Sequence, residues 1–183
     1  TATDGADGNL RTFSESGLSV KVTAFARDDS SGTWSMAYVG AYAGGLGVTD
    51  AGEGGGANNT HSIDNLGCRD NYLVFSFDQL VALDKAYLGY VVCDSDIQVW
   101  IGTLDGAYAN PVGLDDSVLQ SLGFTEVNST TLNSARWADV NSGGVAGNVI
   151  VIAADTTDMS PEDAFKLQKL AVCTLPPVND APQ

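Results

Sequence analysis

Basic residues are scarce in this sequence. Lys and Arg number 8 against 23 Asp and Glu, which gives a formal net charge of −15 over 183 residues. Such a surface repels phosphate, so nucleic acids and anionic membranes are poor partners. Divalent cations, neutral glycans and basic proteins remain compatible with it. The acidity also has a simpler explanation, since net charge keeps a secreted protein soluble.

Long apolar runs are lacking too. A membrane-spanning helix needs roughly 18 or more consecutive apolar residues, and the sequence contains no such run, so we expect no transmembrane segment. Hydrophobic residues still make up 44% of the chain, which is enough to form a buried core. The first residue is Thr1 rather than Met, which fits a mature chain from which a leader was cut.

Catalytic motifs are absent from the sequence. It contains no G-x-S-x-G, no P-loop and no H-E-x-x-H. The single histidine, His61, could pair with Cys68 or Cys173 as base and nucleophile, but a histidine that anchors a loop is the simpler interpretation. A catalytic pair of Asp or Glu residues that hydrolyses glycosides is not excluded, but only because acidic residues are numerous. We therefore expect a protein that is not an enzyme, with a hydrolase as the weakest alternative.

Cysteine is also rare, with three in the chain. Cys68 (LGCRD) and Cys93 (VVCDSD) each adjoin a polar turn and form the preferred disulfide, although the other pairings stay open. Cys173 lies in the apolar run LAVCTL and is expected to be a buried small hydrophobe. A disulfide, together with many Gly, Asx and Ser residues for turns, predicts an extracellular protein.

What the sequence does contain is a series of strand patterns. Alternating or continuous apolar residues predict strands at 18–26, 33–43, 71–77, 81–93, 96–104, 136–140 and 148–154. The last of these is a continuous apolar run after Asn148 and is predicted to be buried on both faces.

The remaining segments are predicted to be irregular, helical or ambiguous. Residues 115–123 begin with Asp and end with Gly and predict one short helix. Residues 163–173 follow a helix-like start at Pro161, but a strand with a bulge is slightly favoured. The glycine-rich segment 44–60 predicts a long loop. DVNSGG at 139–144 predicts a β-turn, because an EF-hand would need Glu where Ile150 stands.

These elements show no strand–helix alternation, which excludes a parallel α/β sheet. They predict an all-β fold, a β-sandwich of jelly-roll type with one short helix and a long Gly-rich loop. A single domain is expected over residues 10–175. It is preceded by a flexible N-terminal arm (1–9) and followed by a Pro-rich linker or tail (176–183).

The middle of the sequence carries a series of motifs that point to a known group. GLGV (45–48) precedes a Gly/Asn-rich loop, HSIDN (61–65) and the strand DNYLVFSFDQLVAL (70–83), and DAFKLQKL (163–170) lies near the end. This series resembles bacterial secreted proteins sorted by exosortase, the PEP-CTERM group, without their C-terminal sorting signal. The resemblance implies an extracellular protein of a Gram-negative cell surface or matrix, and no enzyme activity.

Oxygen-bearing side chains flank the glycine-rich segment. Asp50, Asp64, Asn65 and Asp70 form the predicted metal site, and Asp94 and Asp96 lie just beyond Cys93. Ca²⁺ takes six to eight oxygen ligands of this kind, so Ca²⁺ is the expected cofactor. Turn hydrogen bonds from the IDN segment are the alternative explanation.

Aromatic residues supply the last candidate site. Trp34, Trp100 and Trp137 are candidates for stacking on a glycan, with burial in the core as the alternative. The sequence as a whole predicts a structural or adhesive module of the extracellular surface, stabilised by Ca²⁺ and self-assembling into a homo-oligomer or fibre. The alternative function is a carbohydrate-binding module that uses exposed aromatics.

Overall fold

Antiparallel pairing joins every strand ladder of this fold. The structure is a computed structural model, which describes residues 5–53, 61–158 and 161–175. Its elements, in chain order, are β1 (Arg11–Glu15), β2 (Leu18–Asp28), β3 (Trp34–Tyr42), β4 (Gly45–Thr49), β5 (Ile63–Asp64), a 3-10 turn (Leu66–Cys68), β6 (Arg69–Cys93), β7 (Ile97–Gly102), α1 (Asp116–Ser121), β8 (Phe124–Asn128), β9 (Arg136–Asp139), β10 (Ala146–Ala154) and β11 (Asp163–Thr174).

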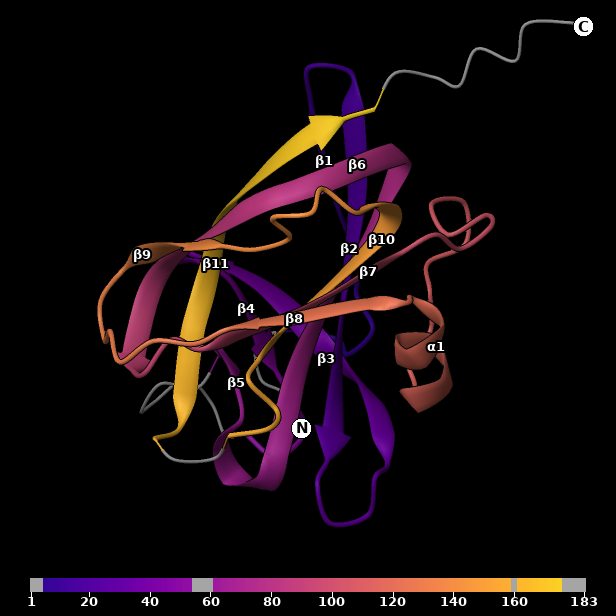
Figure 1. The fold of residues 1–183 in the computed structure, drawn as a ribbon. Coiled ribbons are helices and arrows are strands. Elements are labelled where there is room, and N and C mark those ends of the chain that lie inside the picture. Colours follow the sequence, from indigo (N-terminus) through magenta and orange to yellow (C-terminus); the bar gives the residue numbers. More distant parts are fainter. Residues whose placement is uncertain (1–4, 54–60, 159–160, 176–183) are drawn as a thin grey trace, which may run out of the picture.

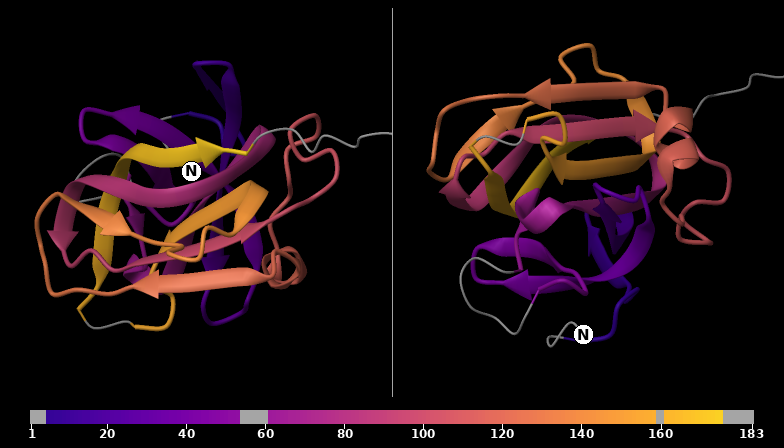
Figure 2. Two further views of the ribbon diagram at one scale, coloured as in Figure 1. Left: turned by 45° about the horizontal axis from the view of Figure 1, so that its top comes forward. Right: turned by 90° about the horizontal axis from the view of Figure 1, so that it is seen from below.

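Strand β6 organises the sheet, because its two halves have different partners. The first half pairs with β2 and the second half pairs with β11 and β9, while β10 pairs mainly with the first half and continues to Val81 and Ala82 of the second. The order β2-β3-β4-β11-β6 returns to β2 and closes a barrel, from which β10, β7 and β8 continue as an outer sheet (Figure 1). Figure 2 shows the N-terminal strands (indigo and purple) on one side and β7, β8 and β10 on the other.

The all-β prediction is confirmed, but the strand order describes a closed barrel with outer strands rather than a jelly-roll sandwich. The difference comes from β6, which spans 25 residues and includes both predicted strands 71–77 and 81–93. Three exposed residues, Asp78, Gln79 and Leu80, mark the place where burial is interrupted along it. Because one strand continues past this interruption, it can close the barrel and also carry the outer sheet.

Two apolar clusters lie on opposite faces of β10. Ile150 and Ile152 belong to the main core, whereas Val149 and Val151 belong to a second cluster that includes Leu122 next to α1. The predicted burial of this strand on both faces is therefore confirmed. The second cluster exists because α1 and the segment before it cover the outer side of β7, β10 and β6.

The glycine-rich segment 44–60 is not a loop throughout. Residues Gly45–Thr49 form β4, and residues 54–60 lie outside the described residues. Val48 donates its backbone N–H to the carbonyl of Ser62 at 3.2 Å. A Cβ at Gly47 would meet the backbone oxygen of His61 at 1.8 Å, so this glycine permits close packing of two backbones. The glycine at position 47 is therefore needed because two backbone segments lie close together, not because the chain forms a loop there.

Several smaller predictions are confirmed. The short helix begins after Asp115, whose carboxylate accepts from the Val118 N–H at 2.9 Å, and Gly123 follows with a φ of 79°. β11 is a strand with register shifts, as the favoured interpretation predicted. Asn141 and Gly144 close the predicted turn through a backbone hydrogen bond of 2.8 Å.

Other parts of the chain were not anticipated. The sequence patterns did not predict β1, β5 or β8. Within the predicted N-terminal arm, the Asn9 side chain donates to the Val39 carbonyl and accepts from the Val39 N–H, so the end of this arm is bonded to β3. The predicted linker 176–183 lies outside the described residues.

Candidate binding face and acidic clusters

A row of three side chains crosses the outer side of β9, β6 and β11. Trp137 on β9 pairs with Tyr87 on β6, which in turn pairs with Lys169 on β11. The Trp137 and Tyr87 ring centroids lie 5.1 Å apart, and the Lys169 Nζ lies 5.7 Å from the Tyr87 centroid. Side chains directly opposite one another on neighbouring strands share one face and stabilise each other, so the three side chains of this row support one another.

Two further lysines extend this row. The Lys85 Nζ lies 5.5 Å from the Trp137 centroid, and it also lies 3.7 Å from the carboxylate of Asp84. The Lys166 Nζ lies 4.9 Å from the Tyr90 ring. The distances from the lysine Nζ atoms to the ring centroids fit cation–π contacts. We call the resulting set the aromatic–lysine face; it consists of Lys85, Tyr87, Tyr90, Trp137, Lys166 and Lys169.

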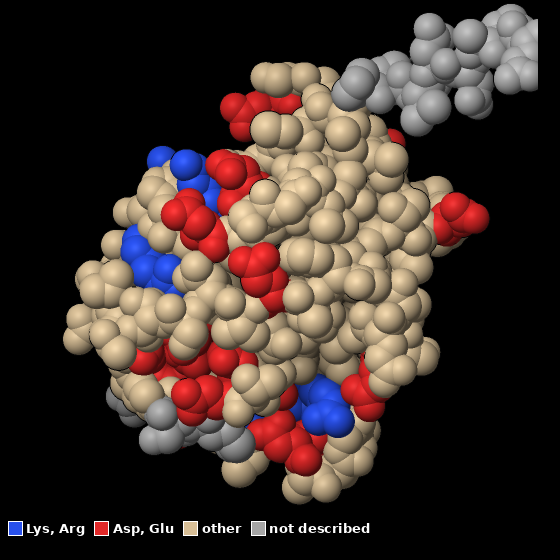
Figure 3. All heavy atoms as spheres, viewed as in Figure 1, with Lys and Arg blue, Asp and Glu red and all other residues tan. Residues whose placement is uncertain are grey.

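The aromatic–lysine face combines exposure with local positive charge. Trp137 is 42% exposed and Tyr90 is 41% exposed. Three of the four lysines in the chain lie on this face, although the net charge is −15. In Figure 3, basic atoms gather at the upper left, over the region of β9, with acidic atoms beside them. The face can therefore present flat apolar rings and ammonium groups to one partner.

The other two tryptophans are placed differently. Trp100 is only 9% exposed and belongs to the second apolar cluster, so its predicted role in glycan stacking is wrong. The physical reason is that α1 and its flanking residues cover the outer face of β7. Trp34 is half-buried; its indole N–H donates to Asp116 at 3.0 Å, and its ring lies 4.7 Å from Tyr72. Of the three predicted stacking residues, Trp137 alone belongs to the aromatic–lysine face.

The four predicted metal ligands are all buried, but they do not converge on one point. The charge of Asp50 raises the pKa of Asp64, so these two side chains act on each other. The side chain of Asn65 instead donates to the carbonyls of Asp155 and Asp158. The Asp70 carboxylate accepts from the Tyr72 hydroxyl at 3.4 Å, and burial together with Asp29 raises the pKa of Asp70 to about 7. The predicted set is thus divided among three places.

The first acidic cluster contains Asp50, Glu53 and Asp64. Burial raises the pKa of Asp64 well above its usual range, and the charges of Glu53 and Asp50 raise it further. The Asp64 Oδ2 has no hydrogen-bond partner among the described residues, and the same holds for the Oδ1 of Asn71, whose Nδ2 donates to Asp50 at 3.1 Å. Both orphan atoms are oxygen acceptors, the ligand type that hard cations require.

The second acidic cluster contains Asp94, Asp96 and Asp163, whose nearest ligand atoms all lie within 4.8 Å of one another. Burial raises the pKa of Asp163 to about 7, with further contributions from the carboxylates of Asp96 and Asp94. Asp163 was not anticipated, because it lies 67 residues from Asp96 in the sequence and no motif connects the two.

Hydrogen bonds already satisfy this second cluster. The Asp163 carboxylate accepts from the Asp96 backbone at 2.9 Å and from Asn65 Nδ2 at 3.4 Å. Asp94 accepts from the Ser95 backbone, and Asp96 accepts from Ser129 and Thr130. The Arg136 guanidinium bonds Ser95 beside it and compensates part of the charge. The orphan oxygen of Asp64 therefore makes the first cluster the stronger candidate for a cation, although the second is more compact.

The cysteines are all free and exposed, so the predicted disulfide between Cys68 and Cys93 is not formed. Cys68 directly precedes β6 and Cys93 is its last residue. The prediction that Cys173 is buried is also wrong, because it lies near the exposed end of β11. His61 is buried and bonds Thr49 through Nδ1, while its backbone N–H donates to Glu53 at 3.1 Å, as a histidine that anchors a loop would do.

The chain has no match among known protein families, curated proteins or solved structures. Within the described residues, no helix has the length and apolar character needed to cross a membrane.

Proposed function

We propose that the chain is a non-enzymatic module of an extracellular surface or matrix protein, and that it adheres through the aromatic–lysine face. The observation that carries this proposal is the row Trp137–Tyr87–Lys169, in which an exposed indole is held by its neighbours on an outer sheet face. Ordered aromatic side chains lose little conformational entropy on binding, so they are effective contact residues.

An acidic glycan is the partner that suits this face. Sugar rings stack on flat aromatic side chains, and the three lysines supply cations for carboxylate or sulfate groups. A neutral glycan would use only the rings. A nucleic acid is a poorer fit, because the net charge of −15 would repel a long phosphate backbone.

A glycan array tests this proposal. The wild type is applied beside Trp137→Ala and Lys21→Ala to neutral oligosaccharides, oligouronates and sulfated oligosaccharides. Lys21 is the matched control, because its Nζ also lies over a ring, that of Tyr108 at 4.6 Å, but outside the aromatic–lysine face. We expect acidic glycans to bind the wild type and Lys21→Ala but not Trp137→Ala. An array without hits, or hits that survive Trp137→Ala, would reject the proposal.

Self-assembly is a second candidate, favoured by the two ends of the sheet. β1 and β8 are the terminal strands in the strand order, and each carries an exposed apolar side chain: Phe13 is 44% exposed and Val127 is 37% exposed. Open strand edges of this kind pair readily with a second copy. Light scattering over a concentration series is expected to show association that Val127→Lys reduces. A monomer at every concentration, with and without Ca²⁺, would exclude self-assembly.

A further inference from the structure

The barrel has an opening between β1 and the last part of β11. β11 pairs with β4 only where Leu167 meets Leu46, and beyond that point it continues to Thr174 with β6 as its partner. Among the described residues β1 pairs with β2 alone. One side of the barrel interior is therefore left without a strand above it, close to the aromatic–lysine face.

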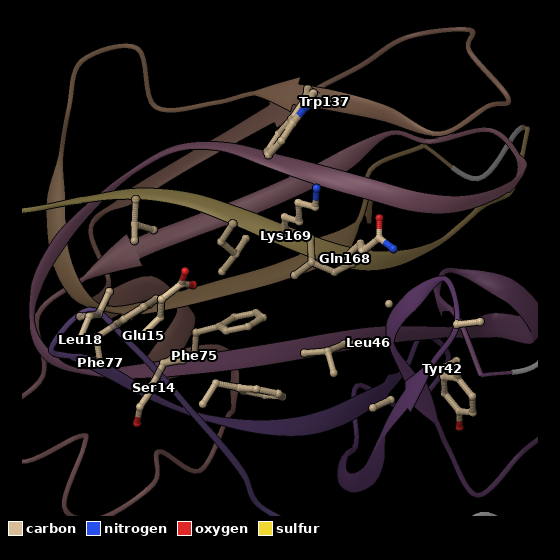
Figure 4. A pocket seen from close by; sticks show the side chains of 18 residues that line it. Ser14, Glu15, Leu18, Tyr42, Leu46, Phe75, Phe77, Trp137, Gln168 and Lys169 are labelled. Carbon is tan, nitrogen blue, oxygen red and sulfur yellow. The ribbon is translucent and has the colours of Figure 1, made fainter.

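A cavity of about 720 Å³ occupies this opening (Figure 4). Volumes of roughly 300–1,000 Å³ are typical of sites for small molecules. Most of its lining is apolar, including Leu18, Val20, Leu46, Phe77, Leu170 and Val172. Several of these side chains also pack against the main core, so the cavity is an accessible extension of the hydrophobic interior.

The polar groups of the cavity lie along its two borders. Lys169 and Gln168 come from β11, and Ser14 and Glu15 come from β1 (Figure 4). Trp137 also borders the cavity, so the cavity meets the aromatic–lysine face there. A ligand with one charged end would therefore find an ammonium on one side and a carboxylate on the other. An anionic end would be directed toward Lys169 and away from Glu15.

We propose that this cavity binds an anionic single-chain amphiphile, such as a fatty acid. Its aliphatic chain would replace water against the apolar lining, which is the driving force for burying hydrocarbon. Its anionic head would meet Lys169 and Gln168 at the border. This site shares Trp137 and Lys169 with the edge of the aromatic–lysine face, but its apolar lining lies in the barrel interior, so binding of an amphiphile goes beyond the adhesive role.

Calorimetry with matched amphiphiles tests the proposal. Dodecanoate and dodecyltrimethylammonium share one chain and differ in head charge, and both are used below their micelle-forming concentrations. We expect one dodecanoate per chain and weaker binding of the trimethylammonium compound. Val172→Trp fills the cavity and is expected to weaken dodecanoate binding by at least roughly tenfold, the effect of a poorly fitting apolar group. Lys169→Gln is expected to weaken the binding of dodecanoate roughly fivefold and to leave the binding of dodecyltrimethylammonium unchanged.

The outcomes separate this site from the glycan contact. Val172→Trp is expected to keep binding to oligouronate, since Val172 lies outside the aromatic–lysine face. No saturable dodecanoate binding by the wild type, or unchanged binding by a folded Val172→Trp, would overturn the proposal and leave the adhesive role untouched. If Val172→Trp does not fold, the exposed substitution Lys169→Gln decides. Equal weakening of dodecanoate and dodecyltrimethylammonium binding by Lys169→Gln would contradict the proposal.

Discussion

Tyr87 and Trp137 face each other directly across β6 and β9, with ring centroids 5.1 Å apart and planes inclined at 54°. Tilted aromatic pairs of this kind contribute about 0.5–1.5 kcal/mol beyond the area they bury. Because Tyr87 holds Trp137 on one side and Lys85 lies over the same indole, the exposed ring has a defined orientation. This relationship turns a solvent-facing tryptophan into a surface prepared for a partner.

The first prediction concerns the lysines of the aromatic–lysine face. If they bind anionic groups, affinity for oligouronate should fall as salt concentration rises, because salt screens exposed charges. Lys85→Ala should lower both the affinity and its salt dependence, whereas Lys21→Ala should change neither. Titrations at several NaCl concentrations measure both quantities. An affinity that is independent of salt would show that the lysines do not contact the ligand.

The second prediction concerns calcium. The orphan oxygen of Asp64, next to Asp50 and Glu53, is expected to gain a ligand when Ca²⁺ binds. At about a hundred times the Kd, binding to the folded state alone adds about 2.7 kcal/mol of stability. For a domain of this size this raises the Tm by roughly 5–10 °C. Asp64→Asn should abolish the shift and Asp163→Asn should keep it, as followed by thermal melts in Ca²⁺ and in EDTA. A Tm unaffected by EDTA would reject bound Ca²⁺.

The third prediction concerns pH. Because burial raises the pKa of Asp163 to about 7 in the folded chain, the folded state holds a proton that the unfolded chain releases near pH 4. The folded state therefore binds more protons than the unfolded state between about pH 4 and pH 7, and stability falls as the pH rises through this window. Asp163→Asn cannot ionise there and should reduce the fall in Tm, while Asp64 and Asp70, whose pKa values burial also raises, keep the remainder. The exposed Asp105→Asn should leave the fall unchanged. A Tm that rises from pH 5 to pH 7, without cation, would contradict this.

The fourth prediction concerns the turn after β9. Asn141 is 3% exposed, has a φ of 57°, and donates from Nδ2 to the carbonyls of Leu83 and Val145. Asn141→Ala leaves these buried groups unsatisfied and should lower the free energy of unfolding by about 2–3 kcal/mol. Urea denaturation measures the change, with the exposed Ser142→Ala as control. A loss no larger than that of Ser142→Ala would show that the side chain does not hold the turn.

Local patterns in the sequence were sufficient for most strands but not for the barrel. After Asn148, residues 149–154 are all apolar, a pattern that predicts burial on both faces, and this part of β10 is buried on both. Barrel closure depends instead on where β6 changes partners, between Phe77 and Val81. Nothing local distinguishes that corner from a loop between two strands, so the sequence favoured a sandwich.

The candidate site shows the same limit. Trp100 and Trp137 both lie in alternating segments, and only the packing of α1 over β7 buries one of them. Asp163 joins Asp94 and Asp96 through the pairing of β11 beside the end of β6, a contact between distant segments. The individual acids near the glycine-rich segment were recognisable from their chemistry. Their division into separate clusters depends on tertiary contacts that sequence spacing does not encode.

The most direct test of the adhesive face follows the three tryptophans at once. In a ¹⁵N–¹H spectrum the indole N–H groups of Trp34, Trp100 and Trp137 give three separate signals, which can be assigned from single Trp→Phe variants. During titration with an oligouronate, we predict that the Trp137 signal moves and saturates, while those of Trp34, bonded to Asp116, and of buried Trp100 stay in place. Movement of the Trp34 or Trp100 signal without that of Trp137, or no movement at all, would contradict binding through this face.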